Sequence, residues 1–130
     1  MSSDKNLHWD RVTDAAPDTL VYRLHGVMGE TDGAFKLHDA LREDLGAESD
    51  EFKKVVMDMS NVEFLSSTGI GIVASCHTTA KNAGRVFVLA AVPRQAARVL
   101  DITGVGAIVA RYKDEAEALD PNAKPEKGGM

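Results

Sequence analysis

The chain has 130 residues, of which 44% are hydrophobic and 5% aromatic, and it carries a formal net charge of −5. This length suits one domain with one largely aliphatic core. The acidic balance argues against a protein that binds nucleic acid. The single cysteine, Cys76, excludes an internal disulfide and is typical of a reducing compartment. No apolar run reaches the roughly 18 residues of a membrane span, and residues 1–6 lack a signal-peptide core, so we expect a cytoplasmic protein.

The hydrophobic pattern predicts one domain over residues 7–119, between a flexible N-terminus at 1–6 and a disordered tail at 120–130. The predicted strands cover, in chain order, residues 7–12, 19–24, 54–59, 85–92 and 107–111. The predicted helices run from Thr31 or Asp32 to about Leu45, from Ser67 to about Ala83, from Pro93 to about residues 100–102, and over 114–119. This alternation predicts an α/β fold with a mixed sheet of four to five strands and about four helices.

Glycines and polar residues set the expected limits of these elements. Gly26 and Gly29 are expected to end the second strand, and Gly104 and Gly106 to interrupt the chain after the third helix. The polar residues that follow Asp58 predict a short loop before the helix at Ser67.

Three hydroxyl residues, Ser66, Ser67 and Thr68, stand where this helix is predicted to begin. Hydroxyls at a helix start cap free backbone N–H groups, which is their commonest use. The same position favours negative charge, because the helix dipole and unpaired N–H groups point at it. A phosphoacceptor is the alternative, since a phosphate there would change what can dock without unfolding the helix.

The outward side of the same helix carries small residues. Gly71, Ala74 and Thr78 lie opposite the predicted core positions, and Ile70 falls between the two sides, where we expect partial exposure. A smooth surface beside a chargeable hydroxyl suits protein docking. An ordinary solvated helix face is the alternative.

Other motifs give no signal for catalysis, a cofactor or a metal. The run Gly69-Ile-Gly-Ile-Val-Ala74 matches G-x-G-x-x-A, but a loop is expected between the preceding strand and Gly69, and no acid follows the next strand. The four histidines show no metal-ligand spacing: His8, His25, His38 and His77. Cys76 is interpreted as a small core residue. We therefore expect a non-enzymatic protein.

The run from Asp58 to Gly71 resembles the central pattern of the STAS domain, the family of bacterial anti-sigma factor antagonists. That pattern is approximately Asp-Leu-Ser-x-Val-x-Phe, an aliphatic residue, Asp-Ser, Ser or Thr, Gly, an aliphatic residue and Gly. This chain reads Asp58-Met-Ser-Asn-Val-Glu-Phe-Leu-Ser-Ser-Thr-Gly-Ile-Gly71, without a gap. Looser likeness extends over 23–26, 84–89 and 93–105.

The resemblance implies regulation of transcription by partner switching. In the family, a partner that is both anti-sigma factor and serine kinase phosphorylates the serine after the Asp, and a phosphatase removes the phosphate. By position, Ser67 is the implied phosphoacceptor, with Ser66 and Thr68 as lesser candidates. The implied partner-binding residues are Ser66, Ser67, Thr68, Gly69, Ile70, Gly71, Ala74 and Thr78. A monomer or weak dimer without cofactor, metal or nucleic acid is expected.

Two positions depart from the family pattern. Ser66 replaces the Asp before the phosphoacceptor, and Gly26-Val-Met-Gly29 replaces a frequent Gly-Glu-Leu-Asp turn. Both expected acids are therefore missing at these positions. Two other functions remain open: a STAS scaffold module in a multi-protein assembly or transport complex, and a nucleotide-binding STAS domain.

Overall fold

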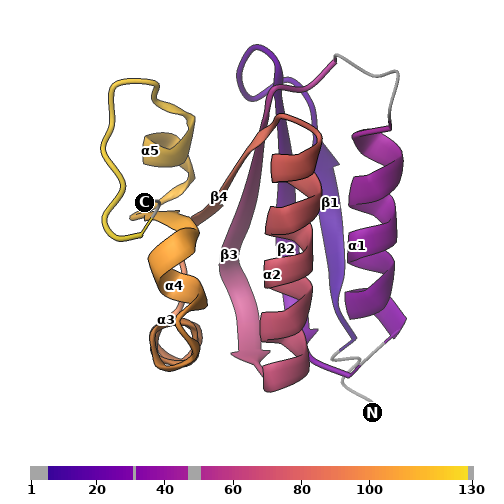
Figure 1. The fold of residues 1–130 in the computed structure, drawn as a ribbon, viewed down its shortest axis with the longest axis vertical. Helices are drawn as coiled ribbons and strands as arrows, with labels where there is room; N and C mark the ends of the chain where they lie inside the picture. Colours follow the sequence, from indigo (N-terminus) through magenta and orange to yellow (C-terminus); the bar gives the residue numbers. More distant parts are fainter. Residues whose placement is uncertain (1–5, 31, 47–50, 129–130) are drawn as a thin grey trace.

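A computed structural model describes residues 6–30, 32–46 and 51–128. Its strands are β1 (His8–Val12), β2 (Thr19–Met28), β3 (Lys54–Leu65), β4 (Val86–Ala90) and β5 (Ala110–Tyr112). Its helices are α1 (Asp32–Asp44), α2 (Ser67–Asn82), α3 (Arg94–Thr103), α4 (Val105–Ile108) and α5 (Glu115–Leu119). The predicted α/β fold is confirmed, with five strands and five helices in the described ranges (Figure 1). None of these helices combines the length and apolar character that crossing a membrane requires.

The five strands form one mixed sheet in the order β1-β2-β3-β4-β5. β1 pairs with β2 antiparallel, whereas the other neighbouring strands pair parallel. Helices connect the parallel strands, as crossover connections require. Parallel pairing places the carboxyl ends of β2 and β3 side by side, and α1 and α2 begin just beyond them.

The two faces of the sheet are covered unequally. α1 and α2 lie next to each other over one face (Figure 1), where they bury the larger core together with residues of α3. The inward positions of α1 are fully buried and aliphatic: Ala34, Leu37 and Leu41. A smaller cluster on the opposite face is closed by Ala118 and Leu119 of α5.

β2 and β3 are both longer than the sequence predicted. Gly26 does not end β2; it has a φ of 103° at an irregularity in the β2–β3 register, and the strand continues to Met28. The short loop expected between Asp58 and Ser67 is also wrong, because β3 extends to Leu65. The two extensions pair with each other, with Val27 opposite Phe64 and Met28 opposite Leu65.

The end of β3 is held by a side chain of α3. β4 pairs with β3 only as far as Asp58 and Ala90, and along the rest of β3 no strand of the described residues pairs on that side. The Gln95 amide takes the place of a strand at Leu65: its Oε1 accepts from the Leu65 N–H at 2.9 Å, and its Nε2 donates to the Leu65 carbonyl at 2.9 Å. This pair of bonds fixes the last residue of β3.

The C-terminal region also differs from expectation. Gly104 has a φ of 84° and ends α3, and the chain then forms α4. The strand expected over 107–111 is therefore wrong at its start, because residues 107 and 108 belong to α4 and β5 covers only Ala110–Tyr112. Residues 120–128, which we expected to be disordered, return to β5. The Arg111 N–H donates to the Lys127 carbonyl at 2.8 Å, and the Glu126 N–H donates to the Arg111 carbonyl at 2.7 Å. Backbone pairing with a strand edge accounts for the order of this segment.

Of the N-terminal segment that we expected to be flexible, residues 1–5 lie outside the described residues. Asn6 is bound: its Oδ1 accepts from the Gly33 N–H at 3.0 Å, at the start of α1.

Candidate functional site

The three hydroxyl residues occupy three different positions at the start of α2. Only Ser66 separates β3 from the helix, and it is the N-cap, with extended backbone angles of −94° and 177°. Its Oγ accepts from the Gly69 N–H at 3.2 Å, and its carbonyl accepts from the Ile70 N–H at 2.9 Å. Ser66 is therefore engaged in the capping that the hydroxyl cluster predicted.

The start of α2 is pressed against the end of β2. The Ser66 N–H donates to the Met28 carbonyl at 3.0 Å. A Cβ on Gly69 would lie 2.1 Å from the Met28 carbonyl oxygen, and one on Gly29 would lie 3.1 Å from Ser66 Oγ. Glycine at position 69 is thus required by the close approach of two backbone segments.

Ser67 and Thr68 differ in their surroundings. Ser67 is the first residue of α2 and is exposed. Thr68 is half-buried, and its Oγ1 donates to Glu30 Oε1 at 3.1 Å. Ser67 therefore presents the accessible hydroxyl of the cluster.

Glu30 supplies an acid that the sequence analysis missed. Neither Ser66 nor the Gly26–Gly29 segment carries an expected acid, and the first turn of α2 has no acidic residue. Glu30 comes directly after Gly29, however, and its contact with Thr68 places a carboxylate at the N-terminal end of α2. The signal in the sequence was an acid, Glu30, one residue after the Gly26–Gly29 segment that was compared with the family pattern.

The remaining residues of the implied partner-binding set divide between surface and core. Gly71 and Thr78 are exposed and Ala74 is half-buried, so they continue the surface of Ser67 along α2. Gly69 and Ile70 are buried, and Ile70 is only 6% exposed. The expected partial exposure of Ile70 is wrong, because its side chain joins the larger core.

One of the two sequence arguments against the glycine-rich fingerprint is wrong. No loop precedes Gly69, since β3 ends at Leu65. The other argument still holds, because no acid follows the next strand.

Burial shifts the pKa of a cysteine and two histidines. Burial raises the pKa of the Cys76 thiol to about 12, consistent with a core cysteine. Burial also lowers the pKa of His38 and of His77. Within 6–30, 32–46 and 51–128, no three His, Cys, Asp or Glu side chains are placed to hold a metal ion.

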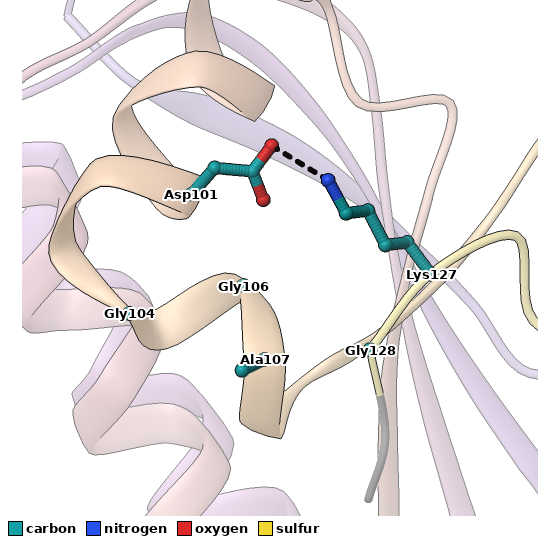
Figure 2. A pocket seen from close by; sticks show the side chains of 6 residues that line it. All are labelled: Asp101, Gly104, Gly106, Ala107, Lys127 and Gly128. Carbon is teal, nitrogen blue, oxygen red and sulfur yellow. Dashed lines mark hydrogen bonds and ion pairs between the residues drawn. The ribbon is translucent and has the colours of Figure 1, made fainter.

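A separate hollow of about 410 Å³ lies beside α4 and the C-terminal segment. Figure 2 shows the Asp101 and Lys127 side chains facing each other across it, with Lys127 Nζ 3.2 Å from Asp101 Oδ2. Hydrogen bonds from Arg111 and Lys127 lower the pKa of the Asp101 carboxyl. Asp101 thus forms ion pairs with Arg111 and Lys127. The pair with Lys127 holds the C-terminal segment beside α3.

One family model and several solved structures match this chain. A family model described as STAS domain matches residues 11–118. An anti-sigma factor antagonist from Mycobacterium paratuberculosis is similar in structure, with a TM-score of 0.74 and 22% identity, over 92% of this chain and 96% of that chain. The Bacillus cell fate determinant SpoIIAA in its phosphorylated form has a TM-score of 0.66 and 16% identity, over 87% and 97%.

The same fold occurs in a transport-related protein. A sulfate transporter family protein from Wolinella succinogenes has a TM-score of 0.67 and 17% identity, over 82% of this chain and 86% of that chain. At such identities, the structural likeness establishes the fold.

Proposed function

Because the chain belongs to the STAS domain family, we propose that it is an anti-sigma factor antagonist that regulates transcription by phosphorylation-controlled partner switching, rather than an enzyme. The observation that carries the proposal is the exposed Ser67 at the start of α2, inside a run that resembles the family pattern without a gap. Its partners are an anti-sigma factor with serine kinase activity and a phosphatase.

The surroundings of the three hydroxyls favour Ser67 as the phosphoacceptor. Ser66 Oγ is bound in the helix cap, and Thr68 Oγ1 is bound to Glu30. In the reaction, Ser67 Oγ attacks the γ-phosphorus of ATP, ADP leaves, and the hydroxyl proton passes to a base of the kinase. Substitution of the family Asp by Ser66 keeps the cap, because Ser and Asp are comparable N-cap residues.

Phosphorylation would change the docking surface more than the fold. A phosphate adds a charge of about −1.5 to −2 and three acceptor oxygens. At the N-terminus of α2 this charge faces a favourable dipole. The exposed part of α2 that follows has small side chains at Gly71, Ala74 and Thr78, so a partner can approach closely. A bulky anion at Ser67 would obstruct that approach.

The proposal is tested by phosphorylation of the purified chain with ATP and its cognate anti-sigma kinase, followed by mass spectrometry of the phosphopeptide. We expect one phosphate on Ser67, its loss in Ser67→Ala, and its retention in Ser66→Ala. The Ser66→Ala control has a weakened cap, so its folding is checked by circular dichroism. Absence of phosphate from residues 66–68, while the kinase modifies another substrate, would contradict the proposal.

A scaffold module of a multi-protein or transport assembly is the second candidate, and the similarity to a sulfate transporter family protein favours it. Size-exclusion chromatography of the native complex separates the two. A large assembly that persists after phosphorylation supports the scaffold, whereas a small complex that dissociates supports partner switching.

A further inference from the structure

Backbone contacts and a hydrogen bond between two side chains join the end of β2 to the start of α2. Met28 accepts from the Ser66 N–H, Gly29 and Gly69 permit close packing, and Glu30 accepts from Thr68. We propose that Glu30 couples the chemical state of Ser67 to the segment after β2: a phosphate on Ser67 and the Glu30 carboxylate compete for the end of α2, and phosphorylation displaces Glu30 from Thr68. This inference rests on the proposed function of Ser67.

The contact explains where α2 obtains its N-terminal negative charge. A helix N-terminus is stabilised by an anion in its first turn, yet the residues of the first turn of α2 include no acid. Glu30 provides the carboxylate from another element, through the Thr68 hydroxyl at 3.1 Å. Glu30 thus supplies the negative charge that the Asp of the family pattern would supply at position 66.

A phosphate at position 67 would occupy the same region. Ser67 and Thr68 are consecutive, so the phosphate would stand one residue from the Glu30 contact, and like charges at short range repel each other. Glu30 is exposed and can turn into solvent. The Thr68 hydroxyl is then free to donate to a phosphate oxygen, so that one charge-assisted hydrogen bond replaces another.

The displacement is local because the backbone contacts remain. The Ser66 N–H bond to Met28 and the packing of Gly69 on the Met28 carbonyl do not involve Glu30. The unphosphorylated surface therefore presents a carboxylate held beside Ser67, and the phosphorylated surface presents one that is released. A partner selective for the unphosphorylated state is expected to place an Arg or Lys against the held carboxylate.

A double-mutant cycle on the isolated chain tests the coupling without a kinase. The four proteins are the wild type, Ser67→Glu, Glu30→Gln and the double variant, and the measurement is Tm at low salt. Ser67→Glu meets the favourable helix dipole in both backgrounds but meets the Glu30 charge only in the wild-type background. We therefore expect its effect on Tm to be more favourable in the Glu30→Gln background than in the wild-type background. In 1 M NaCl the difference between backgrounds shrinks, because salt screens exposed charges.

The matched control is Glu43→Gln, an exposed acid on α1, for which the effect of Ser67→Glu remains unchanged. As a second measurement, Ser67→Glu shifts the amide resonances of Thr68 and Glu30 but leaves that of Met28 nearly unchanged. Additive Tm values and an unmoved Glu30 resonance would overturn the inference. Such a result would say nothing against phosphorylation of Ser67. Conversely, a chain that the kinase does not modify would still give an interpretable double-mutant cycle, so the two proposals can fail separately.

Discussion

Gly69 and Gly71 belong to the same helix turn but serve different purposes. Gly69 lies where the first turn of α2 meets the Met28 carbonyl, with no room for a side chain. A Cβ on Gly71 would meet nothing within 4 Å. The first glycine is needed for packing, and the second leaves the surface beside Ser67 small.

We expect Gly69→Ala to destabilise the fold by about 1–3 kcal/mol, because backbone atoms must separate. Gly71→Ala should stabilise it by about 0.5–1 kcal/mol through reduced chain entropy and better helix propensity. Urea unfolding of the two variants measures both effects. Equal free energies of unfolding for the pair would refute the packing argument.

A histidine side chain links α1 to α2. His38 Nε2 lies 2.8 Å from Thr79 Oγ1, between the two helices. Burial, followed by the charge of Arg42, lowers the His38 pKa below its usual 6.5. The unfolded chain therefore binds the proton more readily than the folded chain, and stability declines as pH falls through and below about 6.5.

The expected observation is a Tm that decreases between pH 7.5 and pH 5.5, and decreases less in His38→Gln, which retains hydrogen-bonding capacity but does not titrate. The pKa of His77 is also lowered by burial, so His77→Gln removes a further part of the slope. A pH profile identical in all three proteins would rule out this role for the helix pair.

The sequence predicted where most elements lie but not how far each strand extends. Apolar runs such as Val55–Met57 identify buried strands, and hydroxyls followed by glycine identified the start of α2. The second half of β3 contains exposed polar residues, among them Ser60 and Glu63, and has no such pattern. It is a strand because β2 pairs with it and Gln95 binds its last residue, and these contacts depend on distant parts of the chain.

In the candidate site, too, the local features were predictable and the long-range contacts were not. Ser67 and the N-cap Ser66 lie in one short run of sequence, and their positions at the start of α2 were predictable from it. The Glu30–Thr68 contact joins residues far apart in the chain and depends on the parallel pairing of β2 with β3. Burial of Ile70 likewise depends on the packing of α2 against the larger core.

The C-terminal segment completes the edge of the sheet beside β5. Three backbone hydrogen bonds link Arg111 with Glu126 and Lys127, and an ion pair ties Lys127 to Asp101. Gly128, with a φ of 79°, packs where a Cβ would lie 2.3 Å from the Val109 carbonyl oxygen. The segment thus covers an edge that is otherwise open to pairing with another chain.

Removal of residues 121–130 is expected to reduce the free energy of unfolding by about 1–2 kcal/mol, mainly through loss of these backbone bonds. The uncovered β5 edge should also increase self-association, measured by sedimentation at several concentrations. Lys127→Met is the control, because it removes the ion pair but keeps the backbone bonds. A truncated chain as stable and as monodisperse as Lys127→Met would disprove the covering role.

The order of the strands in the sheet follows their order in the chain. Each new strand therefore finds its neighbour already made by the preceding segment, and no strand must be inserted between two others. Loop-closure entropy is then limited to one crossover at a time. During synthesis, the sheet can grow from its N-terminal edge as the chain leaves the ribosome, and β5 with its covering segment is the last part to join.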